Sequence, residues 1–105
     1  MNDSNKDIHR IVEAEAFIVR DRNGKKRASL SALQDTPILK LYDTKEQCRL
    51  EISLGREEHV DIPGLAFYDS EGRGRMLLSL VNDFPQVTLM DENGNVMDFL
   101  PRSGG

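Results

Sequence analysis

Apolar and polar residues alternate in short runs along the chain, and one pattern of alternation occurs four times. Each copy has an aspartate, with apolar residues two and four positions before it and another nine positions after it. The four aspartates are Asp21, Asp43, Asp69 and Asp91. A period of two is typical of strands that turn one face to a core. The sequence therefore predicts four copies of one β-unit.

Each copy is expected to be a β-hairpin that turns shortly after its aspartate. Asn23-Gly24 and Asn93-Gly94 stand between alternating runs, and Asn-Gly favours a two-residue turn because both positions need positive φ. Such a turn predicts two cross-strand pairs in each hairpin. They are Phe17–Leu30, Val19–Ala28, Leu39–Ile52, Leu41–Leu50, Leu65–Leu78, Phe67–Met76, Val87–Leu100 and Leu89–Asp98. Every pair except the last is apolar on both sides, and a slip of one residue would remove the match.

The opposite face is predicted to carry different pairs. They are Arg20–Arg27, Tyr42–Arg49, Tyr68–Arg75 and Met90–Met97. In the first two hairpins this face is polar, with Ser29, Ser31, Lys40, Glu51 and Ser53. In the last two it becomes apolar, with Ala66, Leu77, Val81, Met90, Met97 and Phe99. Because a large apolar surface needs cover, we expect an oligomer interface that contains Leu77, Met90, Met97 and Phe99.

The repeat predicts one all-β domain of about eight strands, with four consecutive antiparallel hairpins forming a barrel- or prism-like meander. The domain is expected to span residues 11–100, between a disordered segment at 1–10 and a flexible tail at 101–105. The alternating run IVEAEAFIV favours a long first strand over a short helix. Four extra residues between the second and third copies predict a longer loop from Gly55 to Ile62.

Isolated hairpins are marginally stable, so the four units must pack on one another or on another chain. One arrangement closes the sheet within a single chain. The other completes it in a homo-oligomer, a dimer or trimer, through the apolar outer face of the last two hairpins. We favour the oligomer, and a different protein as partner is also compatible with the pattern.

Composition narrows the classes of partner. The chain has 105 residues, a formal net charge of −4 and one cysteine. An acidic net charge disfavours nucleic acid and anionic membranes as partners. A single cysteine excludes an internal disulfide, and we expect neither a metal site nor a cofactor. The sequence begins without an apolar leader, which favours a cytoplasmic location.

Two groups of charged residues suggest binding. The repeated aspartates could suggest a metal, but at hairpin tips aspartate typically accepts backbone N–H bonds, so we interpret them as turn residues. The first hairpin tip concentrates positive charge. It contains Arg20, Arg22, Lys25, Lys26 and Arg27. This tip is either a patch for an anion or a solvated strand end that discourages aggregation.

Two other residues could carry chemistry. His59 lies beside Glu57, Glu58 and Asp61, which is the only arrangement that suggests a general base. A solvated charge cluster explains it more simply. Cys48 precedes Arg49, which could lower the thiol pKa, but a small half-buried side chain at the base of a hairpin is the simpler interpretation.

Three segments resemble a known group of proteins. They are V-E-A-E-A-F-I-V-R-D-R-N-G-K-K-R-A-S-L, P-x-L-x-L-Y-D and P-G-L-A-F-Y-D-S-E-G-R-x-R. They are similar to uncharacterised bacterial proteins built from tandem F/L-x-L-x-D-x-x-G-x-x-R-x-x-L units. The resemblance covers residues 12–100 and implies the hairpin-repeat fold without implying an activity. Glu46 in place of glycine and Met97 in place of arginine depart from it, which predicts a degraded second turn and a last hairpin adapted to burial.

Because every repeated residue has a role in folding, the leading hypothesis is a non-catalytic structural or protein-interaction module that is not an enzyme. The alternative is a binding protein for a carbohydrate or an anionic metabolite. Its site would use Tyr42, Tyr68, Arg49 and Arg75 as stacking and anion-holding groups. An enzyme based on His59 ranks third.

Overall fold

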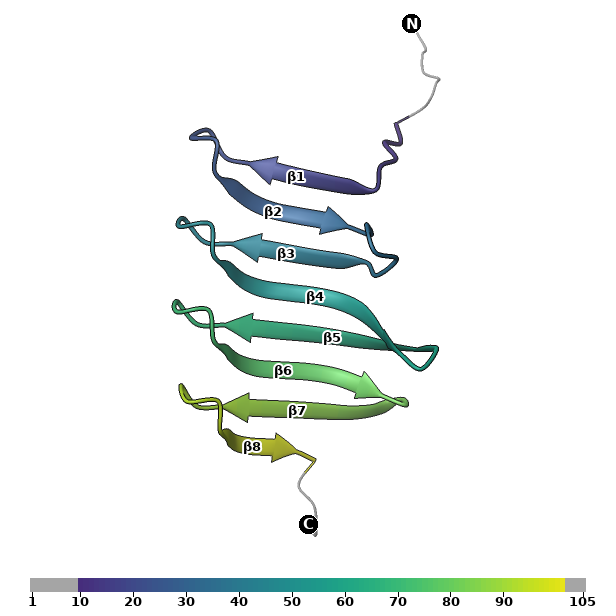
Figure 1. The fold of residues 1–105 in the computed structure, drawn as a ribbon, viewed down its shortest axis with the longest axis vertical. Helices are drawn as coiled ribbons and strands as arrows, with labels where there is room; N and C mark the ends of the chain where they lie inside the picture. The colour runs from purple at the N-terminus through teal and green to yellow at the C-terminus, as the bar shows by residue number, and fades with distance from the viewer. Residues whose placement is uncertain (1–9, 102–105) are drawn as a thin grey trace, which may run out of the picture.

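The fold is an antiparallel sheet of eight strands in a computed structural model that describes residues 10–101 (Figure 1). The strands are β1 Ala16–Arg20, β2 Lys26–Ser31, β3 Ile38–Tyr42, β4 Cys48–Glu57, β5 Val60–Tyr68, β6 Gly74–Val81, β7 Phe84–Met90 and β8 Val96–Leu100. Each strand is hydrogen-bonded to its neighbours in sequence. The described residues contain no helix. The predicted all-β meander of four hairpins is therefore confirmed.

The predicted register is confirmed in the body of all four hairpins, including the pair of Leu89 with Asp98. Pairing between hairpins continues the same lines of side chains, for example from Ile52 to Leu65. Two rows therefore cross the whole sheet on one side, which we call the apolar face. The first row is Phe17, Leu30, Leu39, Ile52, Leu65, Leu78, Val87 and Leu100. The second row is Val19, Ala28, Leu41, Leu50, Phe67, Met76, Leu89 and Asp98.

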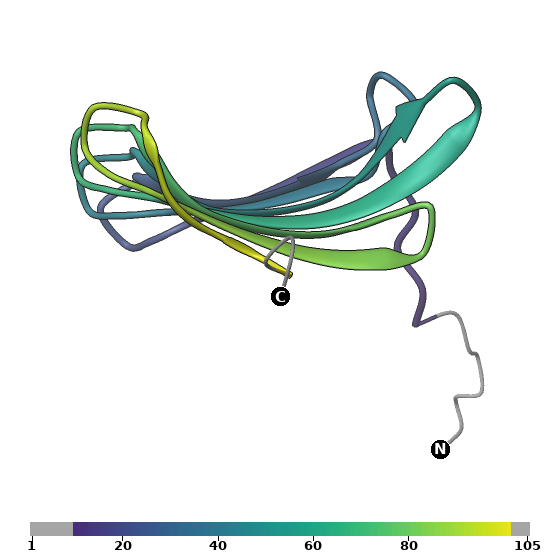
Figure 2. The ribbon, with the colours of Figure 1, turned by 90° about the horizontal axis from the view of Figure 1, so that it is seen from below.

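The sheet is open and one layer thick. β1 and β8 form its opposite edges, and each strand contacts only the strands before and after it. Seen along the stack of strands, the layer is curved but has nothing packed on either side (Figure 2). Closure of a barrel within one chain would need β1 to pair with β8, and this pair is not formed. As a consequence, no side chain among residues 10–101 is fully buried.

The four turns that follow the aspartates differ from the expected two-residue turn. In the first, the Gly24 N–H donates to the Asp21 carbonyl at 2.9 Å and the Asp21 N–H donates to the Lys25 carbonyl at 2.9 Å. Gly24 has φ +82°, and Asn23 is not among the residues with positive φ. This is a three-residue turn with a bulge, which also suits the twist of a hairpin. Asn23-Gly24 does not form its preferred two-residue turn, because the hydrogen bonds of Asp21 close a three-residue turn instead.

The bulge changes the pairs next to these turns. Arg20 pairs with Lys26, and Tyr42 pairs with Cys48. In the same way Tyr68 pairs with Gly74 and Met90 with Val96. The predicted pairs Arg20–Arg27, Tyr42–Arg49, Tyr68–Arg75 and Met90–Met97 are therefore wrong, because the second residue of each pair is the extra residue of the bulge.

At the opposite end of the sheet the connection between the second and third hairpins is shorter than expected. Glu58 and His59 have φ of 51° and 70°, and they alone separate β4 from β5. The expected loop from Gly55 to Ile62 is wrong, because the four extra residues lengthen the two strands and Gly55 pairs directly with Ile62. The long first strand is also wrong, since β1 begins at Ala16 and residues 10–14 belong to no strand. The segment 1–9 and the end of the predicted tail, 102–105, lie outside the described residues.

The second turn is not degraded by its departure from the repeat. Glu46 occupies the glycine position with φ +62°, and the Glu46 N–H still donates to the Asp43 carbonyl at 2.9 Å. A left-handed conformation costs a residue other than glycine roughly 1–2 kcal/mol. We therefore expect Glu46→Gly to stabilise the protein by about 1 kcal/mol in urea unfolding, because the bond that Glu46 Oε1 accepts from the Lys26 N–H is exposed and weak.

The matched control is Gly72→Ala. A Cβ at Gly72 meets no atom within 4 Å, and the residue has φ +84°. Its cost is therefore conformational alone, and we expect a loss of about 1 kcal/mol. A loss of stability in Glu46→Gly would contradict this account of the second turn.

Candidate functional site

The repeated aspartates organise the turns through their side chains. Asp69 Oδ1 accepts the backbone N–H groups of Glu71 at 2.9 Å and Arg73 at 3.0 Å. The other three aspartates make the same two contacts with the residues two and four positions later. These bonds hold the pKa of all four carboxyls below the ordinary value, and that of Asp69 falls to about 2. The interpretation of the aspartates as turn residues is confirmed.

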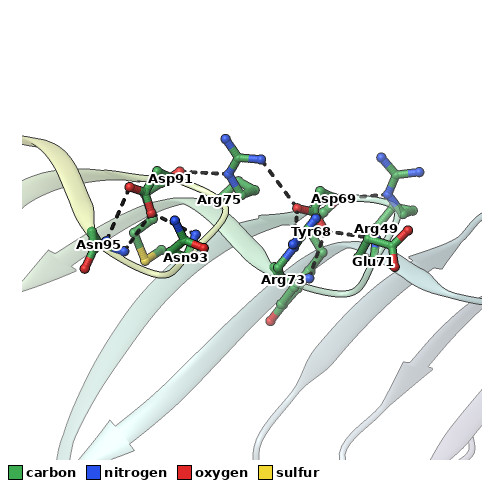
Figure 3. A network of polar contacts seen from close by, with 10 residues as sticks. Arg49, Tyr68, Asp69, Glu71, Arg73, Arg75, Asp91, Asn93 and Asn95 are labelled. Carbon is green, nitrogen blue, oxygen red and sulfur yellow. Dashed lines mark hydrogen bonds and ion pairs between the residues drawn. The ribbon is translucent and has the colours of Figure 1, made fainter.

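Three arginines join each hairpin to the next, and we call these contacts arginine bridges. Arg27 Nε donates to the Tyr42 carbonyl at 3.0 Å, Arg49 Nε to the Tyr68 carbonyl at 2.8 Å and Arg75 Nε to the Met90 carbonyl at 2.8 Å. The Nη1 atom of each arginine also lies 3.4–3.5 Å from the aspartate of its own hairpin. Figure 3 shows two of the three, with Asp69 between Arg73 and Arg75. Each of these three arginines, which are the bulge residues of the first three hairpins, therefore links two hairpins.

The four side chains proposed for ligand binding form hydrogen bonds within the sheet. Arg49 and Arg75 are bound to carbonyl and carboxylate oxygens as described above. The Tyr42 hydroxyl lies 3.2 Å from Ser29 Oγ, and the Tyr68 hydroxyl donates to Glu51 Oε1 at 3.4 Å. Burial, and then the charge of Glu51, raise the pKa of Tyr68. The structure brings the four residues to one end of the sheet, and a ligand site made of them stays a prediction.

The cations of the first hairpin tip are spread over separate contacts. Arg20 Nη1 donates to the Gly24 carbonyl at 2.9 Å, and Lys25 Nζ donates to the Thr44 carbonyl at 2.8 Å. Lys26 Nζ lies 4.7 Å from the centre of the Tyr42 ring, and Arg27 forms a bridge. Arg22 has no such contact within the described part of the chain. An anion site formed by all five stays a prediction.

His59 and Cys48 lie in different parts of the sheet. His59 is exposed in the two-residue turn between β4 and β5, where the nearby Asp61 forms an exposed ion pair with Arg56 at 3.5 Å. Burial, and then the charge of Glu51, raise the pKa of the Cys48 thiol, so the suggested lowering by Arg49 is wrong. Between residues 10 and 101 no group of three or more metal-ligating side chains is formed.

The apolar face extends over all eight strands of the sheet. The cross-strand pairs of this face were predicted from the sequence as part of a core, whereas in the open sheet they form an exposed surface. Val19 is 58% exposed and Ile52 45%. A shallow hollow of about 390 Å³ crosses β4 to β7 on this side, and its lining includes Leu65, Leu78 and Val87. The sequence indicated this exposure only indirectly. The described chain consists of alternating strands and contains no further element that could cover them as a second layer.

The predicted oligomer interface lies on the opposite side, which we call the second face. Leu77 pairs with Ala66 and Thr88 there, and Phe99 continues the row next to Thr88. A Cβ built at Gly74 would lie 3.9 Å from the Met90 methyl group, so Met90 leans over that glycine. Met97 is the bulge residue of β8 and is 66% exposed. The structure thus places Leu77, Met90 and Phe99 on one surface, as expected, and their role as an interface stays a prediction.

The acid sensitivity of the turns can be tested at Asp69. Its pKa of about 2 lies below the ordinary 3.8, so its contribution to stability is complete above pH 4 and disappears as the pH falls through 2. We expect Asp69→Asn to lower the unfolding temperature at pH 7 and the difference from the parent to vanish near pH 2. Glu71→Gln, in the same turn, is the control and should follow the parent. A constant difference between pH 7 and pH 2 would contradict this prediction.

No protein-family model matches the chain, and no curated protein is significantly similar to it. The part of the chain that the structure describes contains no helix of the length and hydrophobicity that crossing a membrane requires.

Proposed function

We propose that the protein is a non-catalytic assembly module that binds another protein surface through its apolar face. One observation carries the proposal. Two rows of side chains cross all eight strands, every member except Asp98 is apolar, and no residue of the described chain is fully buried. A compact domain of about 100 residues buries roughly two thirds of its surface. The sheet lacks that burial until a second layer covers it.

The repeated polar residues support the same proposal. The aspartates hold the turns, and the arginines connect consecutive hairpins. These contacts keep a single layer in register without a core, which is what a module that presents one open face of a sheet requires. The Tyr/Arg ligand site has less support because each of its four side chains already has a hydrogen-bond partner within the sheet. A cytoplasmic location and membership of the bacterial hairpin-repeat group belong to the proposal as well.

The test is the absolute mass of the full chain in solution, together with its thermal unfolding at several protein concentrations. We expect a multiple of the chain mass of 11.9 kDa and an unfolding temperature that rises with concentration, because association stabilises the folded state by mass action. A single chain that unfolds cooperatively at a temperature independent of concentration would overturn the proposal. A single chain without a cooperative transition supports it and identifies the partner as a different protein.

A further inference from the structure

We infer that the partner is a second copy of this chain, packed apolar face against apolar face. In this dimer, hairpin β1–β2 of one copy lies over hairpin β7–β8 of the other. The inference rests on the proposed function and adds the identity and orientation of the partner. Three observations carry it: the area of the face, the distribution of charge along the sheet, and the character of the edge strand β8.

The area of the apolar face suits a dimer. Eight strands at a spacing of roughly 4.8 Å make a face about 38 Å wide. An apolar band of about five residues, at roughly 3.4 Å per residue, gives an area of about 650 Å². A stable interface of standard size buries about 800 Å² on each partner. Two such faces packed roughly 10 Å apart form an ordinary β-sandwich, in which the half-exposed leucines become a shared core.

Charge is distributed unevenly along the sheet. The first hairpin tip carries five cations and one aspartate between Arg20 and Arg27. From Met76 to Pro101 the chain has no lysine or arginine, but it has four acidic residues. A two-fold axis parallel to the strands places β1 over β8 of the other copy. The basic tip of each chain then meets the tip of its partner's last hairpin, which carries Asp91 and Glu92, and this contact occurs twice per dimer. A two-fold axis perpendicular to the strands would instead stack β1 on β1 with the two basic tips at opposite ends of the sheet, so that neither meets the acidic tip of the other chain.

The edge strand β8 disfavours the other way of joining opposite charges, in which β8 of one chain pairs with β1 of the next. Asp98 places a carboxylate in the apolar rows of β8, and an inward-pointing charge on an edge strand is a known protection against edge pairing. Met97 occupies the position at which the other hairpins have a bridging arginine. β8 therefore cannot form an arginine bridge to a strand that pairs with its edge. Edge pairing would also leave the apolar face uncovered.

Orientation is tested with two charge variants, at Arg22 and Glu92, whose side chains form no hydrogen bond or ion pair within the described residues. We expect Arg22→Glu and Glu92→Arg each to weaken the dimer about fivefold at low salt. The double variant should return to within about twofold of the parent, because each reversed charge again meets its opposite. Losses that multiply in the double variant, or no loss in any variant, would overturn this orientation.

The face is tested by thiol labelling in a Cys48→Ser background. Leu41→Cys lies on the apolar face and Leu77→Cys on the second face, and the two leucines are 41% and 39% exposed in the single sheet. We expect maleimide labelling of Leu41→Cys to slow by at least tenfold as protein concentration rises through the dimerisation range, and labelling of Leu77→Cys to stay constant.

Three outcomes would overturn the inference while leaving the proposed function intact. Protection of Leu77→Cys alone would place the interface on the second face. A mass that grows steadily with concentration would indicate edge-to-edge chains. A single chain without a cooperative transition would indicate a different protein as partner.

Discussion

Leu41→Asp is expected to abolish association and, with it, the cooperative unfolding of the protein. Leu41 is 41% exposed in the open sheet, so aspartate there costs little until the apolar face is covered. Covering the face then buries a carboxylate without a partner, at a cost of about 3–5 kcal/mol, and removes about 2 kcal/mol of apolar burial. Because each dimer contains two copies, the dissociation constant should rise by more than about 1,000-fold.

Leu77→Asp is the matched control for this variant. It changes the same residue type at nearly the same exposure, 39%, on the second face. We expect it to keep the mass and the unfolding temperature of the parent in light scattering and calorimetry. Dissociation by Leu77→Asp, with Leu41→Asp unaffected, would instead support the interface of Leu77, Met90, Met97 and Phe99 predicted from the sequence.

The second large effect is expected from Arg49→Met, which removes the central arginine bridge. Arg49 Nε donates to the Tyr68 carbonyl at 2.8 Å, so one side chain connects hairpin β3–β4 to hairpin β5–β6. A hydrogen bond from a charged donor contributes about 1.5–3 kcal/mol. Since the Arg49 side chain is 42% exposed, we expect a loss at the lower end, about 1.5 kcal/mol, in urea unfolding at fixed protein concentration.

The control for this variant uses Met97, which stands in place of the repeat's arginine in the last hairpin. Met97→Arg restores the arginine of the repeat pattern, but in the described part of the chain no strand pairs with the outer edge of β8 to supply an acceptor carbonyl. We therefore expect the stability to change by less than about 0.5 kcal/mol, as for ordinary surface substitutions. Equal losses in Arg49→Lys and Arg49→Met would show that the guanidinium geometry matters, whereas full stability in Arg49→Met would contradict the role of the bridge.

Local alternation determined the register of this protein. Pairs such as Phe17 with Leu30 and Leu65 with Leu78 followed from apolar residues at a spacing of two, because any slip would turn them to the other face. The function of the four aspartates was equally local. Their backbone partners are only two and four residues away, so the short range of an Asx-turn made them predictable from the sequence.

Contacts between hairpins could not be predicted in this way. The bulge moved Arg49 from its expected partner Tyr42 to the carbonyl of Tyr68, in the next hairpin. A two-residue turn with positive φ was expected at Asn23-Gly24, where Asp21 closes a three-residue turn. One formed at Glu58-His59, where a longer loop was expected.

Whether the sheet closes is a property of the whole layer. Alternation indicates that one face is apolar, and this pattern is the same for a barrel, a sandwich and an open sheet. Only the three-dimensional structure shows that β1 and β8 stay apart and that the apolar rows form a surface. The physical reason is that register is determined by neighbouring pairs, whereas closure depends on twist and curvature summed over eight strands.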